Sequence, residues 1–235
     1  MEYNDIGISK DPDYRRIRHL MKIGLFGGLL ALAGDMFLGW GVCDESLSGF
    51  DYYFSRYLSV SDSRIAAASF LGLIGISVEC LSYFSIYRLI VCKSERRAHA
   101  YRSGLLGILM FGAMTHVLCC VTVYVGKKAY LSDPVTAVKH LTDFGLYFLL
   151  PVSILFFVFY ILAAVVQFQA FRNGETPYPG YCRFFSMFSG LPVIMIMRLF
   201  GNKPWAYALS TGWISIGSII MLSGLLIIGK RYHLK

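Results

Sequence analysis

Six long hydrophobic runs alternate with short polar segments along most of this chain. They cover about residues 23–42, 65–91, 103–125, 140–171, 184–200 and 205–229. A helix of about 20 predominantly apolar residues is long enough to cross the hydrocarbon core of a bilayer. The pattern therefore predicts an all-α fold, a polytopic transmembrane helical bundle with six spans.

Two of these runs contain residues that disturb a regular helix. The run at 184–200 is short and is interrupted by Ser186, Ser189, Gly190 and Pro192. The run at 140–171 contains Pro151, which removes one backbone donor and predicts a kink. The sequence thus predicts one weak span and one bent span.

The first run also has features of a secretory signal peptide. It follows a basic segment and contains Ala31-Leu32-Ala33, which resembles a cleavage site. Its apolar character continues as far as Trp40, however, and this length favours a retained span. We therefore expect three parts: a cytoplasmic N-terminal segment 1–22, a transmembrane domain 23–229 and a cytoplasmic tail 230–235.

Composition and charge support this interpretation and set the orientation. The chain is 56% hydrophobic and 15% charged, whereas soluble domains are about 25% charged. Of its Lys and Arg residues, 15 lie on the side of the two termini and 7 on the other side. Cytoplasmic loops carry the excess of basic residues, so both termini are expected in the cytoplasm of a plasma-membrane protein. The net charge of +8 then reflects orientation, and the expected partners are membrane lipids and not nucleic acid.

Two carboxylates and one histidine lie well inside predicted spans, namely Asp35, Glu79 and His116. An ionised carboxylate at the bilayer centre costs about 2.5–3.5 kcal/mol on insertion scales, so such residues normally face protein or a watery cavity. His140 and Asp143 are three positions apart at the outer end of the fourth span, on one helical face. This distribution predicts a polar cavity in the outer half, with the aromatic-rich segment 43–63 as a candidate roof.

Each of these residues also has a structural alternative. Asp35 can act as a clamp by pairing with Arg198 or by hydrogen bonding to His116. Glu79 can be protonated and bonded to a neighbouring backbone group, because burial favours the neutral carboxyl. A lone histidine on an apolar helix is more often a satisfied core residue than a ligand, and His140 and Asp143 are compatible with a helix cap and an interfacial pair.

A divalent metal is a further hypothesis. Cys119 and Cys120 follow His116 at i+3 and i+4, a spacing compatible with a soft metal. Asp35 and Glu79 would supply the remaining ligands. The sequence contains no HEXXH motif and no paired Cys-x-x-Cys motif, so it does not identify the metal.

Several of these residues also carry a resemblance. Gly34-Asp35 in the first span, His116 in the third and His140-x-x-Asp143 at the start of the fourth resemble bacterial multi-pass membrane proteins of unassigned function. The resemblance covers most of the chain. It implies an integral membrane protein with six spans and no known reaction.

Three functions remain open at this point. The first is an intramembrane enzyme acting on a lipid-like substrate, with Asp35, Glu79 and His116 as acid–base or metal groups and with His140 and Asp143 at the mouth of the site. The second is a small-solute or proton-coupled transporter in which Glu79 and His116 relay protons. The third is a non-catalytic binding or assembly protein. The enzyme hypothesis requires the first three residues to face one cavity.

Overall fold

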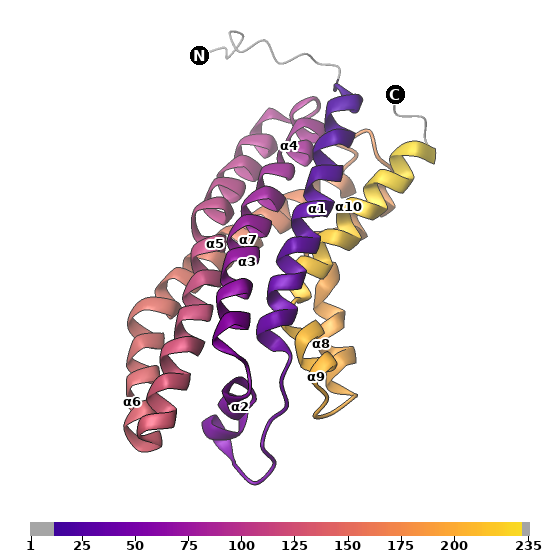
Figure 1. The fold of residues 1–235 in the computed structure, drawn as a ribbon. Coiled ribbons are helices and arrows are strands. Elements are labelled where there is room, and N and C mark those ends of the chain that lie inside the picture. Colours follow the sequence, from indigo (N-terminus) through magenta and orange to yellow (C-terminus); the bar gives the residue numbers. More distant parts are fainter. Residues whose placement is uncertain (1–11, 232–235) are drawn as a thin grey trace.

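The structure is a computed structural model that describes residues 12–231 (Figure 1). Within this range the secondary structure is helical and contains no strands. Five helices are long and apolar enough to cross a membrane. They are α1 (Tyr14–Gly39), α3 (Asp62–Ser82) with α4 (Phe84–Val91), α5 (Glu95–Ser132), α6 (Pro134–Phe144) with η1 (Gly145–Leu149) and α7 (Leu150–Arg172), and α10 (Trp213–Arg231). The prediction of an all-α fold with several helices long and apolar enough to cross a membrane is thus confirmed, and five such helices are present among the described residues.

The start of α1 and the end of α10 lie at the same end of the bundle, which we call the terminal end (Figure 1). The opposite end, the distal end, carries α2 (Gly49–Leu58), α6 and the turn between α8 (Leu191–Arg198) and α9 (Pro204–Thr211). The cytoplasmic orientation expected for this end stays a prediction. The predicted segments 1–22 and 230–235 lie partly outside the described residues.

The predicted span at 184–200 is not a continuous helix. The chain forms two 3₁₀ turns, η2 (Gly180–Phe184) and η3 (Met187–Gly190), followed by the short α8. Pro192 lies in the first turn of α8, where the missing N–H of a proline does no harm, and so α8 begins there. The serines, glycine and proline of this apolar run divide it into short helical segments, and α8 contains no buried residue.

Side chains of α7 satisfy the backbone of this irregular segment. The Tyr160 hydroxyl donates to the Met187 carbonyl at 2.7 Å, and Gln167 Nε2 donates to the Phe185 carbonyl at 3.1 Å. Non-helical backbone at membrane depth is tolerated only where protein or water satisfies its polar groups. These two side chains therefore allow the broken segment to lie within the bundle.

The helix is irregular just before Pro151, where a kink was predicted. Residues Gly145–Leu149 form a π-helical turn directly before α7, and Pro151 lies in the first turn of α7. In this turn the Leu150 N–H donates to the Gly145 carbonyl five positions earlier, so the hydrogen-bonding register shifts just before the proline. The proline is accommodated by a change of helix type.

Two helices extend beyond their predicted limits. α1 begins at Tyr14, where the Asp13 side chain accepts a hydrogen bond from the Arg16 N–H and caps the helix. α5 continues through Lys127 and Lys128, which both pair with Asp62 at the start of α3. Apolar patterning ends at the membrane surface, whereas caps and ion pairs let the helices continue into water.

Small residues bring α1 and α3 into backbone contact. A Cβ atom placed on Gly75 would lie 2.4 Å from the backbone nitrogen of Ala31, so a larger residue would separate the helices. Close approach through small residues is typical of membrane bundles, where no hydrophobic force drives helices together. The glycine-rich spans of the sequence therefore act as packing surfaces.

Apolar side chains fill the terminal half of the bundle. The main core cluster includes Ile17, Met21, Ile86, Leu89 and Tyr101, all of which are almost completely buried. A smaller cluster near the distal end includes Leu38, Ile65 and Val123. Asp35 lies between these two clusters along α1, at the level of a mainly apolar cavity.

Candidate functional site

A cavity of about 250 Å³ lies among α1, α3, α5, α7 and α10. Its wall is mainly apolar and includes Leu38, Ile76, Ile108, Phe156, Phe157, Met187 and Ile214. Asp35, Glu79 and His116 line the same cavity. The sequence-based expectation that these three residues, from three different helices, share one site agrees with this placement.

His116 is held by hydrogen bonds at both ring nitrogens. Its Nδ1 lies 3.3 Å from Asp35 Oδ1, and its Nε2 lies 3.0 Å from the carbonyl oxygen of Ala68 on α3. Gly72 makes this position possible, because a Cβ atom there would lie 2.0 Å from His116 Nε2. A glycine one turn away from Ala68 thus leaves space for the imidazole ring.

The partners of His116 constrain the proton that it shares with Asp35. A carbonyl oxygen only accepts hydrogen bonds, so Nε2 must carry a hydrogen. Nδ1 then either carries a second hydrogen and faces the Asp35 carboxylate, or accepts a hydrogen from the protonated acid. The pair is electrically neutral in both arrangements, which interconvert when one proton moves between Nδ1 and Oδ1, 3.3 Å apart.

Of the two partners considered for Asp35, Arg198 and His116, only His116 contacts it. Its Oδ1 faces His116, and its Oδ2 accepts a hydrogen bond of 2.9 Å from the Ser215 hydroxyl on α10. Arg198 is exposed on α8 and does not line the cavity. The order of contacts is serine to aspartate to histidine, so His116 does not contact the hydroxyl as the base of a catalytic triad would.

Glu79 belongs to a second hydrogen-bonded chain. Its Oε1 is hydrogen bonded to the Tyr83 hydroxyl, which is also hydrogen bonded to the Ser218 hydroxyl. Ser218 Oγ lies 3.2 Å from the Ile214 carbonyl. The expected backbone partner of Glu79 is therefore replaced by hydroxyl side chains. Because the hydroxyls of Tyr83 and Ser218 can rotate, this hydrogen-bonded network accommodates either the neutral or the ionised carboxyl of Glu79.

α10 connects the Asp35–His116 pair to the hydrogen-bonded network of Glu79. Ser215 and Ser218 are three positions apart and lie on the same face of this helix. One contacts Asp35 and the other contacts Tyr83. Sequence analysis missed Tyr83, Ser215 and Ser218, although Tyr83 at i+4 from Glu79 and the Ser-x-x-Ser spacing were available as signals.

His140 and Asp143 are not brought to the cavity. Both lie on α6, where His140 is exposed and Asp143 is half-buried, and neither lines the cavity. Segment 43–63 does not line it either. Phe54 of α2 packs instead against Tyr130 at the distal end of α5. The predicted mouth and roof are therefore separate from the cavity.

The residues present do not form a preorganised metal site. Both nitrogens of His116 already have partners. Among residues 12–231, no group of three His, Cys, Asp or Glu side chains is arranged to hold a metal ion. Cys119 lines the cavity, but the side chains around it do not complete a ligand set.

One polar group of the cavity has no protein partner. Thr115 lines the wall, and its hydroxyl oxygen is buried without a hydrogen bond to any described residue. Buried hydroxyls normally find a partner, because burying one without a hydrogen bond costs free energy. Thr115 therefore provides a free hydrogen-bonding position beside His116.

Comparison with known proteins extends over nearly the whole chain. Residues 1–232 match a family model described as "Family of unknown function (DUF6796)". No curated protein and no solved structure matches the chain.

Proposed function

The chain belongs to the family of unknown function DUF6796, and we propose that it is an integral plasma-membrane protein that binds a small, mainly apolar molecule inside its helical bundle. The ligand is lipid-like in character and carries at least one hydrogen-bonding group. Asp35 and His116 exchange a proton with it, and Glu79 provides the second polar position.

The proposed topology has six crossings and cytoplasmic termini. Five long helices supply five crossings, and η2, η3 and α8 together supply the incomplete sixth. The excess of basic residues, 15 against 7, favours the cytoplasm for the terminal end. The cavity then lies among the spans, within reach of molecules dissolved in the bilayer.

The observation that carries this proposal is the contrast within the cavity wall. Most of the wall is apolar, whereas Asp35, His116 and Thr115 place polar groups on it. Ligand pockets typically combine apolar walls with a few polar groups that fix the orientation of the ligand. The volume of about 250 Å³ is close to the lower limit of such pockets and suits a small molecule.

The hydrogen bonds favour acid–base chemistry over covalent catalysis. The Asp35–His116 pair can give or take a proton, but no serine among residues 12–231 is bonded to the imidazole. We therefore propose proton transfer to or from a lipid-like substrate as the enzymatic form of this function, with Asp35, Glu79 and His116 as its residues. His140 and Asp143 are left out because neither lines the cavity.

Photolabelling with an apolar aryl diazirine tests the proposal. The wild-type protein in nanodiscs is irradiated, and the labelled peptides are mapped. We expect labels on cavity residues of α5 and α7 as well as on the lipid-facing surface. Gly112→Leu fills the cavity, because a Cβ atom at this position already lies 3.3 Å from Ile76 and Phe156.

In Gly112→Leu we expect the cavity labels to disappear and the surface labels to remain. Met110→Leu is the matched control, because Met110 lies on the same helix but is 64% exposed. The absence of cavity labelling in the wild type contradicts the proposal. Proton-linked uptake into proteoliposomes that requires His116 would instead support the transporter.

A further inference from the structure

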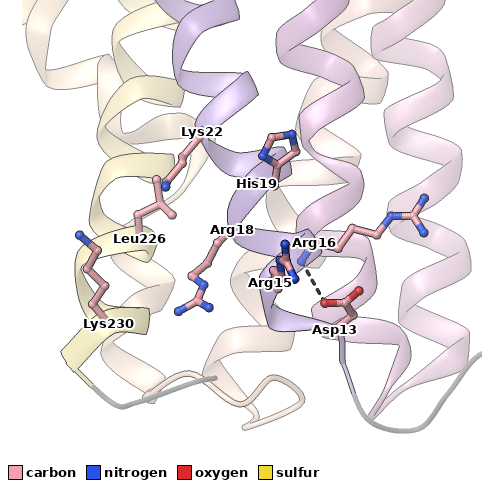
Figure 2. A pocket seen from close by; sticks show the side chains of 8 residues that line it. All are labelled: Asp13, Arg15, Arg16, Arg18, His19, Lys22, Leu226 and Lys230. Carbon is pink, nitrogen blue, oxygen red and sulfur yellow. Dashed lines mark hydrogen bonds between the residues drawn. The ribbon is translucent and has the colours of Figure 1, made fainter.

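A second, open groove lies at the terminal end of the bundle between α1 and α10 (Figure 2). It encloses about 720 Å³. Arg18 and Lys22 extend from α1 toward α10, which contributes Leu226 and Lys230. We call this feature the basic groove, and it is separate from the cavity described above.

The cations of the basic groove have no acidic partner among residues 12–231. Arg15, Arg18, Lys22 and Lys230 form no salt bridge in this part of the chain. Asp13 also borders the groove, but its Oδ1 accepts a hydrogen bond of 3.0 Å from the Arg16 backbone N–H as a helix cap. The groove therefore presents concentrated positive charge.

The exposed face of α1 changes character along its length. Arg15, His19 and Lys22 are exposed near the helix start, and Phe26 and Leu29 continue the same face toward the middle of the bundle. These five positions are three or four residues apart, so they form one stripe. Its basic part lies at the terminal end, and its apolar part lies at the depth of the spans.

α10 shows the same change of character. Lys230 is exposed at its end, and Ile227, one turn earlier, is 67% exposed. Phe26 on α1 is 61% exposed. The basic ends of both stripes line the groove, and the exposed apolar side chains of Phe26 and Ile227 continue each stripe away from it toward the middle of the bundle.

We propose that the basic groove binds the headgroup phosphate of an anionic phospholipid, with its acyl chains along the apolar parts of the two stripes. Basic clusters at the cytoplasmic ends of membrane helices attract anionic lipids. The apolar continuation distinguishes a lipid from a free phosphate ion, because only a lipid has chains to place there. This site is independent of the function proposed for the cavity.

Native mass spectrometry in detergent tests this inference. The protein is offered phosphatidylglycerol and phosphatidylcholine with identical acyl chains in equal amounts. We expect preferential retention of phosphatidylglycerol by the wild type. The triple variant Arg18→Gln, Lys22→Gln, Lys230→Gln should lose this preference by about tenfold or more, because each basic residue contributes about fivefold near an anionic lipid.

The matched control removes three cations from the distal end, with the substitutions Lys139→Gln, Arg198→Gln and Lys203→Gln. These residues are all exposed. The inference is overturned if both triple variants lose the preference equally, or if inorganic phosphate competes as well as the lipid. Equal melting temperatures of the variants verify that they are folded.

A second measurement on the wild type does not depend on any variant. Phosphatidylglycerol with a diazirine in its acyl chain is crosslinked in nanodiscs. We expect crosslinks to peptides that contain Phe26 and Ile227. Crosslinks spread evenly over all lipid-facing helices would overturn the site.

Discussion

The cavity and the basic groove differ in whether their charged side chains have partners within the protein. In the cavity, Asp35, Glu79 and His116 each have hydrogen-bonding partners, and the Asp35–His116 pair is neutral as a whole. In the groove, Arg18, Lys22 and Lys230 form no salt bridge with any of residues 12–231. A buried unpaired charge costs several kcal/mol, whereas an exposed one costs little. Access to water therefore determines which charges need a protein partner.

A neighbouring ion pair shows that carboxylates are available at the terminal end. Arg97 at the start of α5 pairs with Glu175 in the loop after α7. Both side chains are partly exposed, with 27% and 26% of their surface accessible. The cations of the groove lie between α1 and α10, away from this pair, and remain available for a ligand.

Breaking the buried pair should have the largest effect. Asp35→Ala removes the partner of His116 Nδ1 and also that of the Ser215 hydroxyl. Removing one member of a buried pair typically costs about 3–5 kcal/mol, so we expect the free energy of unfolding to fall by about 3 kcal/mol. Reversible unfolding in mixed detergent micelles measures the loss.

The double variant Asp35→Leu, His116→Leu is the control for this prediction. It removes both polar groups, so no unpaired charge remains, and we expect a smaller loss than in Asp35→Ala. A single variant as stable as the wild type would show that the pair contributes nothing to folding.

Filling the space that His116 occupies beside Gly72 should have the next largest effect on stability. Gly72→Ala places a Cβ atom where His116 Nε2 now lies, and the ring must move away from the Ala68 carbonyl. We expect a loss of about 2 kcal/mol in the free energy of unfolding, as for other overpacked interiors. The same unfolding titration measures it.

Gly145→Ala is the matched substitution for this case. Gly145 has no neighbouring atom within 4 Å of the added Cβ, so its replacement should be neutral or slightly stabilising. Equal losses for the two glycines would contradict the assignment of Gly72 to the space needed by His116.

Removing one hydroxyl should have a moderate effect. Tyr83→Phe keeps the ring but deletes the group that joins Glu79 to Ser218. A buried hydrogen bond contributes about 1 kcal/mol, so we expect a loss of about 1–2 kcal/mol. Infrared spectroscopy should show a changed frequency of the Glu79 carboxyl band, whether that group is neutral or ionised, in this variant.

The comparison variant is Tyr53→Phe, because the Tyr53 side chain is 62% exposed. Loss of the Tyr53 hydroxyl should change neither the free energy of unfolding nor the carboxyl band. If Tyr83→Phe leaves the carboxyl band unchanged as well, the hydrogen bond to Glu79 is disproved.

Neutralising the basic groove should have the smallest effect on stability. Arg18→Gln with Lys230→Gln removes no salt bridge formed by the described residues, so the free energy of unfolding should change by less than about 0.5 kcal/mol. Thermal unfolding in a neutral detergent measures it. A loss as large as that of Asp35→Ala would mean that these cations have structural partners.

Hydropathy predicted most of the fold because long apolar runs must form helices in a bilayer. It failed at 184–200, where Ser186 and Pro192 divide the run into short helical segments. It also placed Lys127 in a loop, although this residue continues α5 and pairs with Asp62. Apolar length indicates where the membrane is, whereas capping and ion pairs determine where helices end.

The site was predictable only in part. Asp35, Glu79 and His116 stand out because each is costly inside a span, and they line one cavity. Ser215 and Ser218 do not stand out, because single hydroxyls are common in membrane helices. His140 and Asp143 share a helical face with each other, but that face is not turned toward the cavity. Periodicity gives relations within one helix and not between helices.

The broken segment before α10 has a consequence for biosynthesis. α8 has eight residues, which is too short to remain in a bilayer as an independent helix. The carbonyls before it depend on Tyr160 and Gln167 of α7, and Gly190 packs directly against the backbone of Trp213 and Gly217 in α10. The ribosome completes α7 earlier and α10 later than this segment. This corner of the bundle can therefore assemble only after α10 has been synthesised.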